Sequence, residues 1–215
     1  MNSKVFTLNH NSESVKHLIT HDKLLAQVIE NVGTITYTLA DDPYVFLVEH
    51  IVGQMLSNKV ASIICNRLYD ACGGTISPEA IENLSNEELL SIGISRPKTQ
   101  YIRHLTEVVS NHEFDFEELQ ELPDEDVISK LITLRGVGKW TAKMYLIFYL
   151  NREDVLPFED GAFLQAYKWL YNTDNTSGTS IEEKCLSWKP FSSIAARFLY
   201  KALDKGLTKN ELQRF

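Results

Sequence analysis

The sequence predicts an all-α fold, and three observations support this prediction. Apolar residues recur at three- and four-residue intervals across residues 48–68, over about six helical turns. Ser85 and Glu88 have the spacing of a capping box, which opens a short helix that Gly93 closes. Strand candidates are few, and the best is the β-branched stretch at residues 33–38.

Further helices are predicted on both sides of this region. The same periodicity, more loosely kept, indicates helices within residues 17–32 and 101–109. Pro123 and Asp124 are typical of a helix start and predict a helix over residues 127–133. The sequence contains no internal repeat of the length that marks solenoids or propellers.

Length and composition are those of an ordinary globular protein. The chain has 215 residues, of which 44% are hydrophobic and 23% charged. It can therefore form one compact unit or two small lobes that share a cleft. No stretch approaches the roughly 18 apolar residues of a membrane span, and the N-terminus shows no secretory signal. We expect a cytoplasmic protein with no membrane partner.

Cysteine and histidine patterns argue against a metal or disulfide site. The three cysteines, Cys65, Cys72 and Cys185, are odd in number and form no CxxC pair. The sequence contains no HExxH motif of the kind that binds zinc in metalloenzymes. A disulfide framework, a structural zinc site and a metalloenzyme are therefore not expected.

The formal net charge of -8 argues at first against nucleic acid as a partner, but the charges are unevenly distributed. Residues 113–126 contain eight acidic side chains and no basic one, so the rest of the chain is close to neutral. Residues 127–150 carry no acid and four basic side chains, namely Lys130, Arg135, Lys139 and Lys143. This step indicates one acidic face and one mildly basic face, which favours DNA only weakly.

The most informative stretch, residues 131–166, has the pattern of helix, tight turn, helix, loop and helix. Gly136 and Gly138 permit positive φ and let a partner approach the backbone closely. The second helix begins at about Lys139, where free backbone N–H groups and nearby lysines suit a phosphate. From the glycines alone, a hairpin that only turns a corner is an equally good interpretation.

Asp160 lies where the N-cap of the last of these helices is expected. It precedes an apolar helical stripe formed by Phe163, Ala166, Tyr167 and Leu170. A purely structural cap is one interpretation of this aspartate. The other is a carboxylate that backbone N–H donors keep ionised for chemistry, and the two are compatible.

Four blocks of sequence together resemble one protein family. The blocks are LxxLRGVGKWTA at 131–142, IVGQMLSNKVA at 51–61, LLSIGISRPKTQYIRHL at 89–105 and WKPFSSIAARFLY at 188–200. In their order they are similar to the helix-hairpin-helix (HhH-GPD) DNA glycosylase superfamily, closest to 3-methyladenine DNA glycosylase II, over about residues 40–205. The resemblance implies one glycosylase unit over residues 1–215, with two helical lobes that flank a DNA-binding cleft. It places the helix-hairpin-helix motif at about 126–150 and packs N-terminal helices at about 1–40 with the C-terminal helices.

The resemblance also implies that Asp160, at the end of Leu-Pro-Phe-Glu-Asp, is the catalytic carboxylate. Breaking a purine N-glycosidic bond develops oxocarbenium character on the sugar, and a fixed carboxylate can stabilise that cation and activate water. Glu159 is the competing candidate, because the family often has two acids there. Alignment with the helix start favours Asp160.

Trp140 determines the predicted subtype. Bifunctional relatives have a lysine at this point of the hairpin, whose amine forms a Schiff base with the sugar, and tryptophan cannot do so. The adjacent Lys139 points about 100° away on the helix and suits a phosphate contact, so we expect hydrolysis without AP lyase activity. Trp140 resembles the aromatic pocket wall that stacks on cationic alkylated purines. A core tryptophan that packs the hairpin is the alternative.

Further contacts follow from the same resemblance. Gln54 and Met55 match residues that fill the gap left by a flipped base. We expect Gln54 to contact the substrate and Met55 to insert into the DNA. Periodicity alone would instead place Met55 in the core. Tyr200 matches an aromatic pocket position, and Met144 stands where some relatives have tyrosine. The hairpin residues expected at DNA are Gly136, Gly138, Lys139, Thr141 and Lys143. The backbone carbonyls expected around a structural Na⁺ or K⁺ are those of Ile132, Leu134 and Val137.

The chain departs from some relatives in two ways. It lacks the four-cysteine cluster that holds an iron–sulfur centre, and Ser192 replaces an arginine. We also expect no N-terminal β-rich domain of the kind found in longer relatives. No other cofactor is expected, and the acidic run at residues 113–126 should lie away from DNA.

The sequence as a whole predicts a monomeric, monofunctional DNA glycosylase of base excision repair, nucleoid-associated if bacterial. It would act on double-stranded DNA, flipping and hydrolytically excising alkylated purines such as 3-methyladenine and 7-methylguanine. The alternatives are a glycosylase for another damaged or mismatched base and a non-catalytic DNA-binding module that keeps the hairpin.

Overall fold

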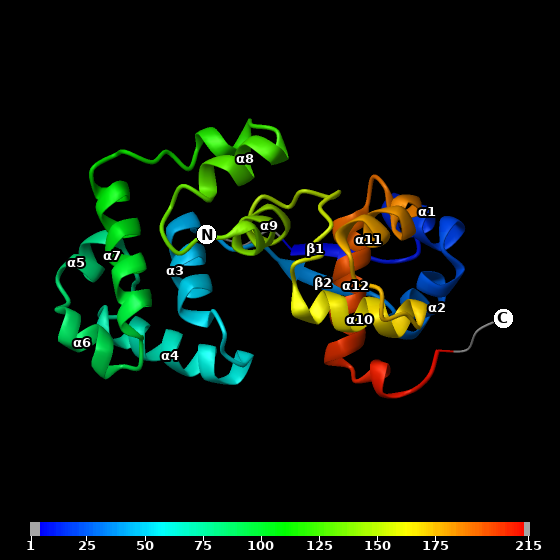
Figure 1. Cartoon of the computed structure of the whole chain (residues 1–215), viewed down its shortest axis with the longest axis horizontal. Helices are drawn as coiled ribbons and strands as arrows, with labels where there is room; N and C mark the ends of the chain where they lie inside the picture. Colours follow the sequence, from blue (N-terminus) through cyan, green and yellow to red (C-terminus); the bar gives the residue numbers. More distant parts are fainter. Residues whose placement is uncertain (1–4, 213–215) are drawn as a thin grey trace. The chain divides into compact units, whose positions relative to one another are not determined.

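The computed structural model describes residues 5–212, which divide into two compact units. Unit 1 comprises residues 5–39 and 146–212, and unit 2 comprises residues 40–145. The described residues are mostly helical, with one two-stranded antiparallel sheet (Figure 1). The all-α prediction is confirmed, with this small sheet as its exception.

Unit 1 combines the two ends of the chain. Its elements are β1 (Val5–Leu8), α1 (Glu13–His21), α2 (Lys23–Val32), β2 (Ile35–Thr38), α10 (Gly161–Tyr171), α11 (Gly178–Lys184), η2 (Leu186–Trp188), α12 (Ser192–Asp204) and η3 (Leu207–Lys209). The helices α1, α2 and α10 pack against α12, and Figure 1 shows the blue N-terminal helices beside the red α12. The strand predicted at residues 33–38 is confirmed as β2, in which Ile35 pairs with Leu8 of β1.

A buried carboxylate divides the helix predicted over residues 17–32 into α1 and α2. Asp22 has extended backbone dihedrals, and its Oδ1 accepts hydrogen bonds from the N–H groups of Leu24 and Leu25, both at 3.0 Å. Its Oδ2 accepts from Trp188 Nε1 at 2.8 Å and from the Tyr171 hydroxyl. With 9% of its surface exposed, this carboxylate ties α2 to α10 and η2 through four donors.

Unit 2 is a bundle of helices around α3 and α7. Its elements are α3 (Pro43–Gly53), α4 (Asn58–Ala71), α5 (Pro78–Glu82), α6 (Asn86–Ser91), α7 (Arg96–Ser110), η1 (Glu118–Gln120) and α8 (Asp124–Leu131). A further helix, α9 (Lys139–Phe148), begins in unit 2 and ends in unit 1. α3 packs against α4 and α7, while α5 and α6 pack against α7.

The structure confirms the helix starts and ends that the sequence predicted in unit 2. The Ser85 hydroxyl accepts from the Glu88 N–H at 3.1 Å, and the Glu88 carboxylate accepts from the Ser85 N–H at 2.7 Å, which completes the capping box of α6. Gly93, with φ of +105°, follows the end of this helix. The helix expected over residues 127–133 is α8, which begins earlier, at Asp124.

The prediction of one helix across residues 48–68 is wrong. α3 ends at Gly53, and α4 begins at Asn58 with Ser57 as its N-cap. The apolar pattern continues across this break although α3 buries its apolar residues and α4 buries only Ile64 and Leu68. Periodicity alone therefore does not reveal the turn between the two helices.

No helix within residues 5–212 is long and apolar enough to cross a membrane. The thiols of Cys65, Cys72 and Cys185 are free. The described part of the chain holds no cluster of three or more His, Cys, Asp and Glu side chains that could bind a metal ion.

Replacing Asp22 with alanine should lower the free energy of unfolding by about 3 kcal/mol, because two backbone N–H groups, an indole and a phenol lose their acceptor. Asp42→Ala is the matched control. Asp42 caps α3 through a single bond from the Val45 N–H at 2.8 Å on an exposed surface, and its loss should cost about 1 kcal/mol. Urea unfolding followed by circular dichroism measures both, and equal losses would contradict the role of the buried network.

Candidate active site and nucleic-acid interface

Asp160 is the N-cap of α10, as the sequence predicts. Its Oδ1 accepts a hydrogen bond from the Phe163 N–H at 2.8 Å, and its own N–H donates to the Pro157 carbonyl at 2.9 Å. The apolar stripe that follows it is buried in the core of unit 1. The carboxylate therefore has a fixed position at the positive end of a helix.

Tyr200 on α12 lies next to this carboxylate within unit 1. Burial, and after it the neighbouring Asp160 charge, raise the pKa of the Tyr200 phenol well above its usual range. The phenol therefore keeps its proton and remains a neutral hydroxyl beside the carboxylate. Two of the residues singled out from sequence are thus neighbours, although they are far apart in the chain.

The Tyr200 ring packs against a cluster of aromatic rings and one arginine within unit 1. The ring of Phe148 lies 6.0 Å from that of Tyr200, and the guanidinium of Arg197 lies 4.7 Å from the centre of the Phe148 ring. The same guanidinium lies 3.9 Å from the Tyr37 ring and donates to the Ile147 carbonyl at 2.6 Å. Arg197 is 7% exposed, so this cation is held inside unit 1 by rings and one carbonyl.

Ser192, where relatives have arginine, anchors the loop that precedes Asp160. Its hydroxyl donates to Asp154 Oδ1 at 2.5 Å, and the next hydroxyl, that of Ser193, accepts from the Val155 N–H at 2.9 Å. The start of α12 therefore fixes the loop at residues 153–155. The departure from the family pattern thus places the buried Ser192 where a charged side chain is usual, next to the buried Ser193.

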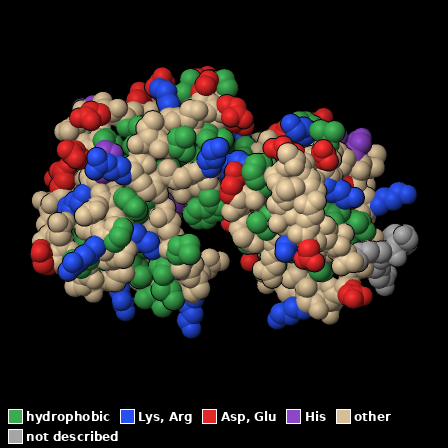
Figure 2. Space-filling model, in the orientation of Figure 1, with side chains coloured by type: hydrophobic (Ala, Val, Ile, Leu, Met, Phe, Trp, Pro, Cys, Tyr) green, Lys and Arg blue, Asp and Glu red, His purple; other side chains and the backbone are tan. Residues whose placement is uncertain are grey.

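In unit 2, the turn between α3 and α4 presents Met55 to solvent. Met55 has φ of +59° and is 100% exposed. A non-glycine residue in the left-handed region costs energy, and such strain is concentrated at functional positions. The interpretation of Met55 as a core residue is therefore wrong. Leu56 in the same turn and Val60 and Ile63 in α4 are also exposed, and Figure 2 shows hydrophobic side chains gathered over α4.

Lys98 and Gln54 hold this turn in place. The Lys98 ammonium donates to the carbonyls of Val52 at 2.8 Å and Gln54 at 2.7 Å, at the negative end of α3. The Gln54 amide donates to the Gly136 carbonyl at 2.7 Å, which links the turn to the hairpin between α8 and α9. Sequence reasoning assigned Lys98 no role beyond its match to a family segment.

The hairpin itself depends on one glycine rather than two. Gly136 has φ of +84°, and a Cβ built on it would collide with the Tyr101 ring and come within 2.8 Å of the Tyr101 Cβ. Gly138 has neither a positive φ nor an atom within 4 Å of such a Cβ. The expectation of positive φ at Gly138 is therefore wrong. α9 begins at Lys139, as predicted.

Other predicted hairpin residues differ in exposure. Lys139 is exposed and Lys143 is half-buried. Thr141 and Met144 are buried, so neither side chain offers a surface contact to DNA. Lys130 is paired with Glu118 of the acidic run, and Figure 2 shows acidic side chains along the upper edge of unit 2, around α8.

Trp140 has an aromatic neighbourhood in unit 2. Its ring lies 6.0 Å from the imidazole of His50 on α3, at an angle of 47°. His50 in turn stacks on Phe46 at 3.9 Å and 23°. Trp140 itself is half-buried, so part of it is open to a ligand.

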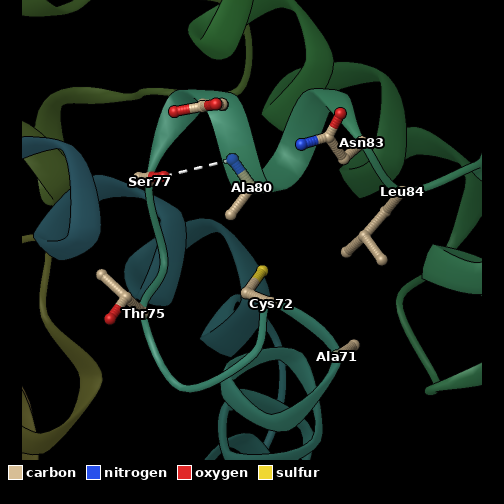
Figure 3. Close-up of a pocket in the computed structure, with 8 residues that line it drawn as sticks. Ala71, Cys72, Thr75, Ser77, Ala80, Asn83 and Leu84 are labelled. Atoms are coloured by element: carbon tan, nitrogen blue, oxygen red, sulfur yellow. Dashed lines mark hydrogen bonds between the residues drawn. The ribbon is translucent and has the colours of Figure 1, made fainter.

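A pocket of about 440 Å³ lies elsewhere in unit 2, between the end of α4 and α5 (Figure 3). Its lining includes Cys72, Thr75, Ser77 and Asn83 and none of the residues predicted to act on a substrate. In Figure 3 the Ser77 hydroxyl caps α5 by accepting from the Ala80 N–H at 3.1 Å. These polar groups serve local structure.

Comparison with known proteins gives consistent matches. Residues 48–191 match the profile of the HhH-GPD superfamily of base excision DNA repair proteins. DNA-3-methyladenine glycosylase 1 of Schizosaccharomyces pombe is 30% identical over 167 residues, which cover 74% of this chain and 72% of that protein.

Solved structures agree with this match. The crystal structure of a DNA-3-methyladenine glycosidase from Bacillus halodurans has a TM-score of 0.83 and 33% identity, and the match covers 97% of this chain and 96% of that one. A 3-methyladenine DNA glycosylase of S. pombe in complex with abasic DNA has a TM-score of 0.82 and 27% identity, with 90% of this chain and 97% of that one covered.

Gly136→Ala should destabilise the protein by more than about 2 kcal/mol, because the new methyl group meets Tyr101 and the residue must hold a positive φ. Gly138→Ala, the matched control, should change stability by less than about 0.5 kcal/mol. Chemical denaturation compares the two variants. A similar loss for both would mean that the hairpin does not depend on Gly136 in particular.

Proposed function

Since the chain belongs to the HhH-GPD superfamily of base excision DNA repair proteins, and within it to the 3-methyladenine DNA glycosylase family, we propose that it is a monofunctional glycosylase for alkylated purines. It binds duplex DNA, flips the damaged nucleotide and hydrolyses its N-glycosidic bond. The observation that carries this proposal is the Asp160 carboxylate, fixed by the Phe163 N–H with the buried Tyr200 phenol beside it.

Asp160 supplies the negative charge that the reaction requires. As the bond between C1′ and the base nitrogen lengthens, its electrons leave with the base and positive charge develops on the sugar. The carboxylate stabilises that charge and accepts a proton from the water that attacks C1′. A cationic alkylated purine leaves as a neutral base, so departure needs no further acid.

The residues of unit 2 supply recognition. Trp140 offers a face for stacking and cation–π attraction to an electron-poor purine. Met55 is the wedge that fills the gap left by the flipped base. The N-terminus of α9, with Lys139 beside it, suits a backbone phosphate.

The turn between α8 and α9 is the proposed place for a monovalent cation. Its candidate ligands are the backbone carbonyls of Ile132, Leu134 and Val137. The Leu134 carbonyl accepts from the Val137 N–H at 3.0 Å, and a carbonyl has a second lone pair for a cation. When bound, such an ion would supply positive charge for a DNA phosphate.

Asp160→Asn should abolish base release from methylated duplex DNA, by roughly 100-fold or more, while the fold is kept because asparagine also caps helices. Glu159→Gln, at the competing acid, should retain most activity. Free base is measured by chromatography, and abasic sites are counted separately from strand breaks. Loss of activity in the Glu159 variant alone would transfer the catalytic role to that residue.

Borohydride treatment during the reaction should trap no protein–DNA adduct, because Trp140 stands where a Schiff-base lysine would be needed. Trp140→Ala should lower release by about 10- to 100-fold through lost stacking, which is worth about 1–3 kcal/mol per base. A trapped adduct would show lyase chemistry at another amine. Unchanged activity in the Trp140 variant would mean that this ring only packs the hairpin.

Met55→Gly should leave stability unchanged or slightly higher, because glycine tolerates the positive φ of this position. The same variant should raise the KM for damaged duplex, since the gap left by the flipped base is no longer filled. Thermal unfolding and steady-state base release test the two halves of this prediction. Normal kinetics would exclude the wedge.

A further inference from the structure

His50 is a polar side chain beside the Trp140 ring for which the family resemblance predicted no role. It lies in the last turn of α3, four residues before Gln54, and its ring is 6.0 Å from that of Trp140. Phe46, one turn earlier on the same helix, stacks under the imidazole at 3.9 Å and 23°. The ring is therefore held in one orientation by packing.

The hydrogen bonding of His50 fixes its tautomer. Nδ1 lies 2.8 Å from the Phe46 carbonyl, and a carbonyl only accepts, so Nδ1 carries the proton. Burial lowers the pKa of His50, which keeps the ring neutral at pH 7. Nε2 is then a lone-pair acceptor.

Nε2 remains available for a ligand. Among the described residues the contacts of His50 are its Nδ1 bond, the Phe46 stack and the Trp140 ring, and none engages Nε2. The side chain is half-buried rather than sealed in the core. A fixed acceptor beside an aromatic wall is what a pocket needs to distinguish stacked bases that differ in one edge group.

We propose that His50 is a specificity-determining residue that accepts a hydrogen bond from the exocyclic amino group of an adenine lesion stacked on Trp140. Adenine carries an amino donor at C6, where guanine carries a carbonyl whose lone pairs would face those of Nε2. The pocket therefore favours 3-methyladenine over 7-methylguanine. This inference rests on the proposed function, of which it names the preferred substrate.

A purely structural role for His50 makes a different prediction. If the imidazole only supports Trp140 and Phe46, its replacement changes the release of both bases by the same factor. A hydrogen bond to one base changes their ratio, because only the adenine lesion loses a partner.

The test uses the full chain and duplex DNA treated with a methylating agent, which contains 3-methyladenine and 7-methylguanine in one sample. His50→Phe keeps an aromatic ring on Phe46 without the acceptor, and His50→Gln restores an acceptor oxygen. Release of both bases is measured by chromatography for the wild type and both variants, after circular dichroism has verified their folding.

We expect His50→Phe to lower the ratio of 3-methyladenine to 7-methylguanine released on the order of tenfold, with His50→Gln recovering part of that preference. An unchanged ratio in His50→Phe, or an equal fall in both bases, overturns the role of His50 while the proposed function stands. Release of neither base by the wild type contradicts the proposed function itself and this inference with it.

Discussion

The ammonium group of Lys98 is the contact on which the turn between α3 and α4 and its link to the hairpin depend. It binds the carbonyls of Val52 and Gln54, so α3 ends there and the chain turns instead of continuing into α4. The positive φ of Met55 follows from that turn. Because Gln54 also binds the Gly136 carbonyl, the same turn is linked to the hairpin, and the position of Met55 relative to the hairpin is fixed. The Lys98 cation thus interacts favourably with the dipole of α3 and stabilises the turn that contains the strained Met55.

The sequence predicted best what local signals determine. The capping box at Ser85, the start of α9 after the hairpin and the N-cap at Asp160 each need only a few neighbouring residues. The break between α3 and α4 depends on a lysine more than forty positions away, and the break at Asp22 on partners in α10 and η2. Helical periodicity runs through both breaks, so these ends were not predictable from it.

The polar groups behind the candidate site were missed for a related reason. Arg197 contacts Tyr37, Phe148 and the Ile147 carbonyl, which lie far from it in sequence, so no spacing motif marks it. An arginine on an apolar helix ordinarily indicates a solvated face. Here its charge is dispersed over two rings inside unit 1. His50 bonds within its own helix, yet its importance comes from Trp140 on another element.

The distribution of charge is consistent with the proposed binding of DNA by an acidic chain. The eight acids at residues 113–126 lie around η1 and α8. One of them, Glu118, forms an ion pair with Lys130. The cationic surface of the hairpin is therefore smaller than the sequence suggested and is centred on the start of α9. Attraction to phosphate in such a protein must be local, with the helix N-terminus and a few side chains close to the backbone. On the proposed function, binding specificity rests on Met55 and Trp140, and a neutral group such as His50 contacts a base without repelling a cationic one.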